Sequence, residues 1–393
     1  MKKIIIYIPG YKRITLIWLM ENNNLYIGIL SGTSMDSIDC GVFRFHKNKC
    51  TLISFSENEY PLGIKNQITN NQKEVLKDYK NSNINTELSA EYSKIINDLL
   101  EKENIKSYDI KAIGMHGQTL SHGEKDGKKF SIQLGCPSTL ANQTKIKVIS
   151  DFRQHDIKNG GSRAPLAPLF HEFVFKKNNT KRVIVNIGGI SNISRLSNEQ
   201  EKLIGFDSGP GNTLIDVWMR KKFNMNYDKD GNIAARINSN DKLIEIFLKD
   251  AYFQLKCPKS TSTEYFNYDW IIKNISKSKL NIGDNEILST LTNLTAVSIV
   301  QSINEYSKNC KEIYICGGGA NNNSIMRYIE AKAKNIISNE IIVKTTSDLN
   351  FHPKTVEAGL FAWLAMSKID NQKLDYRNIT GSNIPLELGK IYS

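Results

Sequence analysis

A strand–turn–strand pattern occurs twice in this chain and limits the fold more than any other feature of the sequence. The apolar run LYIGIL from Leu25 is followed by the turn SGTSMD and by a second alternating run, CGVFRF. The segment RVIVNIGGISNISRL repeats this order, with two glycines at the turn. Glycine lets a ligand approach the backbone closely. Because the two openings lie about 160 residues apart, the pattern predicts two similar halves.

The segments outside these openings alternate between helix-like and strand-like patterns. Apolar residues recur at helical spacing over 88–100 and 287–306, and TVEAGLFAWLAMSKI near the end of the chain is also helix-like. Short apolar runs such as IKAIGM, KVISDF and EIYIC are typical of strands. This alternation predicts an α/β fold with a largely parallel sheet. Since 393 residues exceed the size of one growing core, we expect two lobes with a ligand cleft between them.

The charge and cysteine content narrow the class of protein. The formal net charge is +12, but the lysines are scattered along the chain and form no dense block. This surplus would suit an anionic ligand, yet a solvated lysine-rich surface explains it better, and we expect no nucleic acid partner. The six cysteines form no CxxC pair, and several lie in apolar runs. Buried, reduced thiols of this kind indicate a reducing compartment, and the cytoplasm fits best.

The first twenty residues, MKKIIIYIPGYKRITLIWLM, begin like a signal peptide, with two lysines and an apolar stretch. Pro9, Gly10, Lys12 and Arg13 interrupt that stretch, and no small-residue cleavage site follows. The segment is also too short and too charged to span a bilayer. We therefore expect residues 1–20 to be an extension outside the fold, with Met20 as an alternative start, and we expect no membrane partner.

The turn SGTSMDSID ends the first predicted strand and offers a phosphate site. Gly32 lets the backbone approach a phosphate, and backbone N–H groups can donate to its oxygens together with the hydroxyls of Thr33 and Ser34. The carboxylate of Asp36 can hold Mg²⁺, directly or through water, as phosphoryl transfer requires. Taken alone, an ordinary polar hairpin turn explains these residues equally well.

A second glycine-rich segment, GFDSGPGNTLIDVW, places Asp207 at the end of an apolar strand and before a helix. The positive end of the helix dipole favours phosphate, and Gly209, Gly211 and Asn212 lie in the loop. Asp207 could act as a general base beside the transferred group. The alternative is a plain helix N-cap at Asn212 or Thr213, with Asp207 as a turn residue. We favour the functional interpretation.

Three further polar segments follow predicted strands. IYICGGGANNNS carries residues 317–320, where bare backbone could take a flat ring such as adenine, although a mobile loop is the alternative. MHGQTLSH and SDFRQHDIKNGGSRAP offer donors and acceptors for sugar hydroxyls, and Arg153 could bind a carboxylate through two hydrogen bonds. We expect His116 to be a hydrogen-bonding residue, since no HxxxH spacing accompanies it. The chain contains no Walker A motif and no GxGxxG pattern.

In their order along the chain, seven motifs resemble those of the anhydro-N-acetylmuramic acid kinase family. They are SGTSMDSID, HGQT, SDFR with the later GG and APL, NIGGISNIS, GFDSGPGN, CGGGANN and VEAGLFAWLA. The resemblance implies a two-lobed α/β fold of the actin/hexokinase type, a ribonuclease H-like duplication with a ligand cleft between the lobes. We expect residues 21–150 plus about 354–393 to form lobe I and residues 151–353 to form lobe II.

The resemblance also implies an ATP-dependent reaction. The anhydro bond of 1,6-anhydro-N-acetylmuramic acid is hydrolysed while O6 is phosphorylated, which gives N-acetylmuramic acid 6-phosphate in peptidoglycan recycling. By this resemblance Asp207 is the base that activates water, and Asp36 binds Mg²⁺. The residues expected to face the sugar are His116, Gln118, Thr119, Arg153 and Asp156. The residues expected to bind ATP are Gly32, Thr33, Ser34, Met35, Asp36, Ser37, Ile38, Asp39, Gly188, Gly189, Gly209, Gly211, Asn212, Gly317, Gly318, Gly319 and Ala320.

The chain departs from the family pattern at two places. Ser37 stands where the family usually has a glycine, and GGSRAP stands where it usually has GGQGAP, so that Arg163 could alter substrate contacts or face solvent.

The resemblance further implies a homodimer. Two other functions stay open: a related sugar kinase that breaks no anhydro bond, and a catalytically silent nucleotide-binding module. The silent module predicts loss of the site carboxylates, whereas Asp36, Asp39 and Asp207 are all present.

Overall fold

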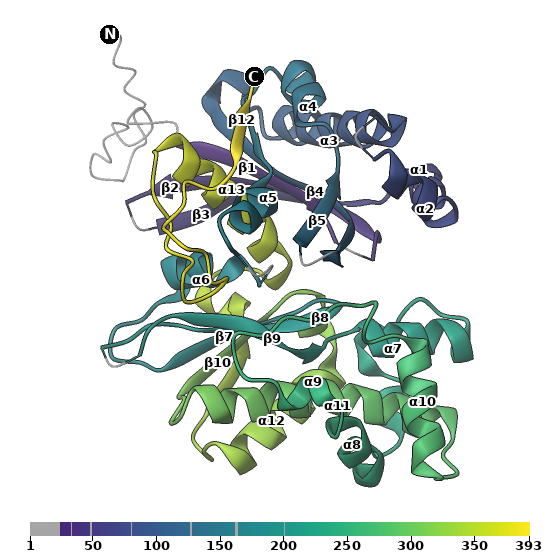
Figure 1. The fold of residues 1–393 in the computed structure, drawn as a ribbon. Helices are drawn as coiled ribbons and strands as arrows, with labels where there is room; N and C mark the ends of the chain where they lie inside the picture. The colour runs from purple at the N-terminus through teal and green to yellow at the C-terminus, as the bar shows by residue number, and fades with distance from the viewer. Residues whose placement is uncertain are drawn as a thin grey trace, which may run out of the picture.

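The computed structural model describes residues 24–393 apart from positions 33, 48, 80, 126, 127, 162, 163 and 200, and it describes only the backbone of residues 73, 122, 124, 125 and 128. The expected extension at residues 1–20 and the positions Thr33, Ser162 and Arg163 lie outside the described residues. Within the described part, two β-sheets lie one above the other with helices between and around them (Figure 1).

The first sheet contains both predicted strands of the N-terminal opening. Among the described residues its main path runs in the order β12-β6-β4-β1-β2-β3, and β5 pairs with β4 beyond this path. The strands are β1 (Leu25–Ser31), β2 (Ser37–His46), β3 (Lys49–Glu59), β4 (Ile110–Lys125), β5 (Lys128–Leu134), β6 (Val148–Ser150) and β12 (Lys390–Tyr392). The predicted hairpin is confirmed, because β1 and β2 pair antiparallel from Leu25 opposite Arg44 to Ser31 opposite Ile38.

The second sheet repeats the topology of the first. Its order is β11-β10-β7-β8-β9, which corresponds strand for strand to the path β6-β4-β1-β2-β3 of the first sheet. Its strands are β7 (Arg182–Ile187), β8 (Ile190–Arg195), β9 (Ile204–Pro210), β10 (Glu312–Cys316) and β11 (Ile342–Thr345). In both sheets the first strand pairs antiparallel with the second and parallel with the fourth. The two halves predicted from the sequence are therefore a structural duplication.

Helices cover both faces of each sheet. Those packed with the first sheet are α1 (Leu62–Asn70), α2 (Gln72–Lys77), α3 (Asn83–Lys102), α4 (Pro137–Thr144), α5 (Phe152–Lys158), α6 (Ala167–Phe175) and α13 (Val356–Ile369). Those packed with the second are α7 (Thr213–Trp218), α8 (Asp241–Leu248), α9 (Ala251–Gln254), α10 (Tyr268–Ser278), α11 (Asp284–Tyr306) and α12 (Asn323–Ile336). The predicted helices over 88–100, over 287–306 and at the C-terminal end are α3, α11 and α13.

Close packing of α13 against the first sheet requires glycine on two strands. A Cβ atom on Gly28 of β1 would lie 1.8 Å from the carbonyl oxygen of Ala358, and one on Gly114 of β4 would lie 1.9 Å from that of Phe361. Backbone therefore meets backbone at this contact. The same apolar cluster continues through α6 to Ile184 of the second sheet, so α13 and α6 form a shared layer between the two sheets (Figure 1).

Three expectations from the sequence are corrected by the fold. The sheets are mixed and not largely parallel, since hairpins make up half or more of the pairings in each. His116 and its neighbours do not follow β4 but lie within it, because β4 continues outward to pair with β5. Asp207 likewise lies inside β9, which pairs with β8 as far as Pro210. Short-range patterns show where an apolar run ends but not where pairing ends.

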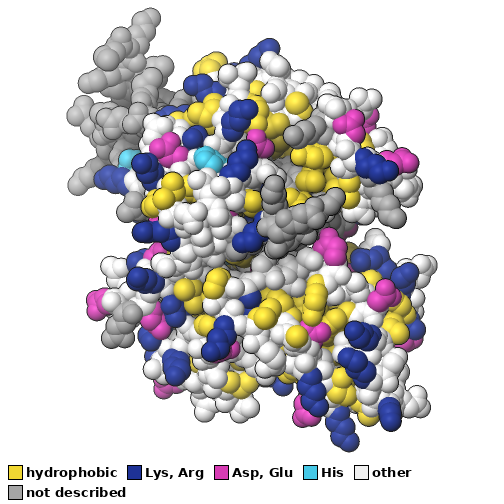
Figure 2. All heavy atoms as spheres, in the orientation of Figure 1, with side chains coloured by type: hydrophobic (Ala, Val, Ile, Leu, Met, Phe, Trp, Pro, Cys, Tyr) yellow, Lys and Arg dark blue, Asp and Glu magenta, His cyan; other side chains and the backbone are white. Residues whose placement is uncertain are grey.

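The surface agrees with the scattered charge of the sequence. Figure 2 shows lysine and arginine side chains spread over this face, with acidic side chains among them. Within the described residues, no helix combines the length and apolar character needed to cross a lipid bilayer.

Candidate active site between two glycine-rich turns

The glycine-rich segments of the second sheet pack against one another at the end of β7. The amide of Gly211 donates to the carbonyl of Gly189 (2.9 Å), and that of Asn212 donates to the carbonyl of Gly188 (2.8 Å). A Cβ on Gly211 would lie only 2.3 Å from Gly188 O. Asn212 directly precedes α7 but its side chain makes no capping bond, which argues against the plain N-cap interpretation for this residue.

The third glycine segment joins the same surface. Gly317 has φ of 79°, and a Cβ there would lie 2.3 Å from the side-chain oxygen of Asn186. A Cβ on Gly319 would meet the side chain of Ile187 at 2.2 Å, while one on Gly318 would have its nearest neighbour, the side-chain nitrogen of Asn212, at 4.0 Å. Residues 188–189, 211–212 and 317–320 therefore pack together in one glycine-rich surface, which we call the glycine cradle, and the Cβ positions of Gly188 and Gly318 meet no atom closer than 3.7 Å. Such a surface can take phosphates or a flat ring.

The turn between β1 and β2 carries the first-lobe residues of the predicted site. It closes with a hydrogen bond from Met35 N to Gly32 O (3.0 Å), and Lys65 of α1 donates to Met35 O (2.9 Å). The side chain of Asp36 is 70% exposed and lies 3.3 Å from the Lys65 ammonium. Ser34 lies in the turn, whereas Ser37 and Ile38 belong to β2. The Ile38 side chain is buried in the apolar core.

Asp39 and Asp216 place two further carboxyl groups near this turn. Burial raises the pKa of Asp39 to about 6, and the charges of Glu357 and Glu57 add to that rise while a hydrogen bond from Ser37 opposes it. Burial also raises the pKa of Asp216 on α7 to about 7, where Arg220 lowers it and the charge of Asp36 raises it. The interaction of Asp36 with Asp216 means that the turn of the first sheet faces the helix that follows the glycine cradle.

Asp207 is enclosed by α9 and the segment that follows it. The amide of Thr261 donates to its carboxylate Oδ2 (2.9 Å), the hydroxyl of Tyr252 donates to its carbonyl (2.6 Å), and its own amide donates to the carbonyl of Lys259 (3.1 Å). Burial raises the pKa of Asp207 to about 6, against the hydrogen bonds from Thr261 and Ser260 and the charges of Arg153 and Lys259. A carboxyl group with this pKa is largely ionised at neutral pH and can accept a proton.

Glu357 is a site residue that the sequence reasoning missed. It lies in the first turn of α13, and its Oε1 accepts a 3.1 Å hydrogen bond from the side-chain amide of Asn186 on β7. Burial raises the pKa of Glu357, whereas the bond from Asn186 and the charge of Arg153 lower it. The available signal was a single carboxylate within the otherwise apolar run VEAGLFAWLA. Only the contact with the second sheet distinguishes it from an ordinary helix-terminal acid.

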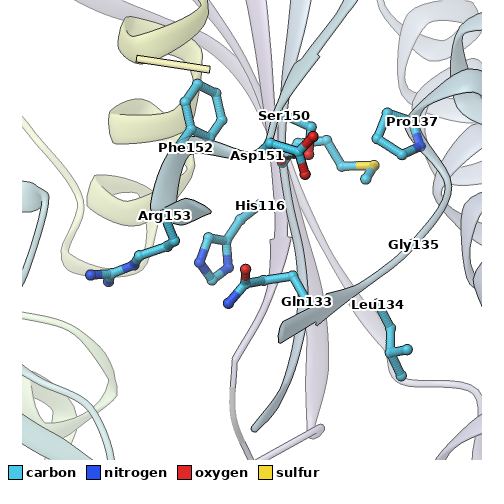
Figure 3. A pocket seen from close by; sticks show the side chains of 10 residues that line it. His116, Gln133, Leu134, Gly135, Pro137, Ser150, Asp151, Phe152 and Arg153 are labelled. Carbon is cyan, nitrogen blue, oxygen red and sulfur yellow. Dashed lines mark hydrogen bonds between the residues drawn. The ribbon is translucent and has the colours of Figure 1, made fainter. Parts of the chain in front are cut away.

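His116 lies in a small pocket lined by the middle of β4, the end of β5 and the segment that follows β6. Figure 3 shows its imidazole between the side chains of Arg153 and Gln133. Within the described residues, neither ring nitrogen has a hydrogen-bond partner, and the ring packs 4.6 Å from that of Phe361. Burial, with a smaller effect of Arg153, lowers the pKa of His116 to about 3, so the ring is neutral. A neutral imidazole can both donate and accept a hydrogen bond.

The other predicted sugar-facing residues make hydrogen bonds within the protein. Gln118 is fully buried and donates to the carbonyl of Thr119 (3.1 Å), while Arg153 donates to the carbonyl of Ala164 (2.8 Å). The carboxylate of Asp156 is buried and accepts a 2.7 Å hydrogen bond from Thr380. Direct contacts of these residues with a sugar stay predictions.

Two lobes of repeated topology, with a glycine cradle on one and a facing turn on the other, form an arrangement that suits a two-lobed kinase. Residues 24–393 match the family model described as anhydro-N-acetylmuramic acid kinase, and the chain therefore belongs to that family. It is a phosphotransferase.

Relatives with this name align over almost their whole length. A kinase of Shewanella pealeana is 38% identical over 375 residues, covering 94% of this chain and 99% of the relative. One of Coxiella burnetii is 36% identical over 374 residues, covering 93% and 97%. A solved structure similar to this chain is the activator of the 2-hydroxyisocaproyl-CoA dehydratase from Clostridium difficile with bound ADPNP. It is 13% identical, with a TM-score of 0.45 and coverage of 88% of this chain and 96% of that one.

Proposed function

We propose that this enzyme uses ATP and water to convert 1,6-anhydro-N-acetylmuramic acid into N-acetylmuramic acid 6-phosphate. The observation that carries the proposal is the position of Asp207, a buried carboxyl group with a pKa of about 6 in the lobe that bears the glycine cradle. The name shared by the family and its relatives supplies the sugar. We further propose that the enzyme acts in peptidoglycan recycling, in the cytoplasm and as a homodimer.

The reaction needs one general base near two steps, the attack of water on the anomeric carbon and the transfer of the phosphoryl group to O6. A water molecule attacks the anomeric carbon, Asp207 accepts its proton, and the bond between that carbon and O6 breaks. O6 takes the γ-phosphoryl group of ATP, and ADP leaves. The water, the anomeric carbon and the phosphoryl group must therefore be held together, which is the contribution of the two lobes. Lys259 and Arg153 keep Asp207 ionised through their charge.

The two turns would hold ATP from opposite sides. We assign the adenosine to the backbone of residues 317–320 and the phosphates to residues 188–189, 209–212 and the segment 32–39, which comprises the turn and the start of β2. The exposed carboxylate of Asp36 fits a magnesium site, because Mg²⁺ needs only one or two carboxylates beside water and phosphate oxygens. Mg²⁺ bound there would neutralise the charge of the transferred phosphoryl group.

The sugar would lie between Asp207 and the pocket of His116. The neutral imidazole of His116 supplies one donor and one acceptor, which suits a hydroxyl group. Arg153 carries a positive charge close to both Asp207 and Glu357 and could bind the carboxylate of the muramic acid. Thr119, Gln118 and Asp156 complete this proposed sugar site.

The product distinguishes this reaction from that of a sugar kinase that breaks no anhydro bond. The purified protein is incubated with Mg-ATP and 1,6-anhydro-N-acetylmuramic acid, and product mass is measured together with ADP release. A product that has gained both water and a phosphoryl group supports the proposal. Gain of a phosphoryl group alone supports the ordinary sugar kinase, and ATP binding without turnover of any sugar supports the silent module.

A further inference from the structure

The turn between β1 and β2 is fixed by hydrogen bonds to three of its carbonyl groups. The amide of Met35 donates to the carbonyl of Gly32 (3.0 Å). The amide of Tyr60, which follows β3, donates to the carbonyl of Asp36 (3.2 Å). The carbonyl of Met35 accepts from the ammonium of Lys65 on α1 (2.9 Å). Two of these donors come from outside the turn, so its shape depends on the end of β3 and on α1.

The amide groups of the same turn are left for another acceptor. Within the described residues, the amides of Ser34 and Asp36 make no hydrogen bond, and both residues are exposed. Exposed backbone amides in a tight turn are the usual donors to phosphate oxygens. The turn therefore offers donors to a phosphate, while carbonyl oxygens that would repel one are occupied by protein donors.

Met35 has a backbone conformation that is uncommon for its residue type. Its φ is 53°, in the left-handed region that glycine adopts freely and other residues adopt only at an energetic cost. The peptide group after Met35 carries both the carbonyl bound by Lys65 and the amide of Asp36. Because that group is planar, the hydrogen bond that fixes its carbonyl also fixes the direction of its amide.

The core of the first lobe holds both partners of this hydrogen bond. The helix of Lys65, α1, buries Ile64 and Ile68 in that core, and the side chain of Met35 packs against it as well. The side chain of Lys65 is only 32% exposed, although lysine is usually a solvent-exposed residue. The position of the ammonium at the Met35 carbonyl is therefore set by packing.

Lys65 could also act through its charge, since its ammonium lies 3.3 Å from Asp36 Oδ1. The side chain of Asp36 is 70% exposed, and an ion pair at such a position contributes little because water screens it. The hydrogen bond to Met35 O is shorter, at 2.9 Å. The geometry therefore favours an effect of Lys65 on the shape of the turn over an effect on its charge.

We infer that Lys65 is a positioning residue for the phosphates of ATP. Its hydrogen bond to Met35 O holds Met35 in the left-handed conformation and directs the amide of Asp36 to the opposite side of the peptide group, toward the phosphates. The inference rests on the assignment of this turn to the phosphates in the proposed function. It requires no contact between Lys65 and the adenine ring or the sugar.

The test measures nucleotide binding in EDTA and without sugar, so that neither a metal ion nor turnover contributes. Lys65→Met removes the donor and should weaken ATP binding about 10-fold, the usual loss for a hydrogen bond to a charged group. Adenosine, which has no phosphate, should bind as it does to the native enzyme. Lys65→Arg keeps a donor and should retain most of the ATP affinity. Lys94→Met, at an exposed position of α3, serves as the control.

Two second substitutions in the Lys65→Met background separate shape from charge. Met35→Gly should restore ATP affinity at least about 3-fold, because glycine adopts a positive φ without the cost that Met35 bears. Asp36→Asn removes the carboxylate that Lys65 neutralises and should restore nothing. Recovery with Asp36→Asn but not with Met35→Gly would assign Lys65 to charge neutralisation and overturn its positioning role.

The remaining outcomes separate this inference from the proposed reaction. An unchanged ATP affinity in Lys65→Met, or an equal loss for ATP and adenosine, would overturn the role of Lys65 while the reaction stands. A native enzyme that binds ATP no more tightly than adenosine, with or without Mg²⁺, would overturn the assignment of the phosphates and the proposed function with it. In turnover assays Lys65→Met should raise the KM for ATP and leave the KM for the sugar unchanged, a split that misfolding would not produce.

Discussion

The side-chain amide of Asn186 donates a 3.1 Å hydrogen bond to Glu357 Oε1 and so links β7 of one lobe to the first turn of α13 on the other. Arg153 and Asp39 both interact electrostatically with Glu357. One buried carboxyl group therefore accepts a hydrogen bond from the second lobe and interacts electrostatically with β2 of the first lobe and with the proposed sugar site. It is a natural point at which closure of the lobes and alignment of the substrates are coupled.

Glu357→Gln should lower kcat by about 100-fold, because an amide of equal size removes the charge that interacts with Arg153 and leaves the substrates misaligned. The hydrogen bond from Asn186 can persist, so ATP affinity should change little. Steady-state kinetics measure the first effect and calorimetric titration with ATP the second. Glu330→Gln, on the exposed face of α12, is the matched control. An unchanged kcat in Glu357→Gln would remove this residue from the site.

Asp207→Asn should lower kcat by about 10²- to 10⁴-fold, the usual contribution of a positioned general base. In the native enzyme the pKa of Asp207 is raised to about 6, and the ionised form is the active one. The value of kcat/KM should therefore fall as the pH drops through about 6. The variant should lose this acidic limb. A limb that persists in Asp207→Asn would show that another group acts as the base.

Asp36→Asn should raise the Mg²⁺ concentration needed for half-maximal rate about 10-fold, since a neutral amide is a poorer ligand for a hard cation. The rate at saturating Mg²⁺ should recover in large part. A titration of the rate with Mg²⁺ at fixed ATP measures this shift. The same curve for Asp36→Asn and the native enzyme would assign the metal to other groups.

Gly211→Ala should destabilise the protein by about 1–3 kcal/mol, because the added methyl group would lie 2.3 Å from Gly188 O and the two loops must separate. ATP affinity should fall in parallel, since the glycine cradle is opened. Urea denaturation and ATP titration measure the two effects. Gly63→Ala, where a Cβ meets no atom within 4 Å, is the control and should be neutral or slightly stabilising.

Acid should destabilise the fold through His171. Its Nδ1 lies 2.8 Å from Ser194 Oγ, and burial lowers its pKa to about 3 from an unfolded value of about 6.5. Between these two values the unfolded chain binds a proton that the folded chain does not, so the free energy of unfolding falls as pH decreases, by about 1.4 kcal/mol per pH unit from this residue.

Urea denaturation at pH 7 and pH 5.5 measures the slope of stability against pH. His171→Asn should reduce this slope, although the buried His116 still contributes, and His46→Asn, at an exposed position, should leave it unchanged. Loss of the difference between these two variants would contradict a neutral, buried His171.

Much of the fold follows from local patterns of the sequence. The apolar runs that become β1, β7 and β10 are bounded by glycines, and α3, α11 and α13 have helical spacing, so each element forms where its own residues favour it. The repeated opening is likewise visible, because a hairpin is a local structure. The mixed strand order was not predicted, since pairing depends on contacts between distant segments.

The candidate site likewise combines features that the sequence predicts with features that only the tertiary structure creates. Glycine-rich turns mark Gly188, Gly211 and Gly317 in the sequence, and at Gly211 and Gly317 a side chain would meet neighbouring protein atoms. Their convergence on one cradle, the bond between Asn186 and Glu357, and the enclosure of Asp207 by Tyr252 and Thr261 arise only when segments far apart in the chain come together. The raised pKa of Asp207 also depends on tertiary structure, because the neighbours that desolvate its carboxyl group are brought together only by tertiary packing.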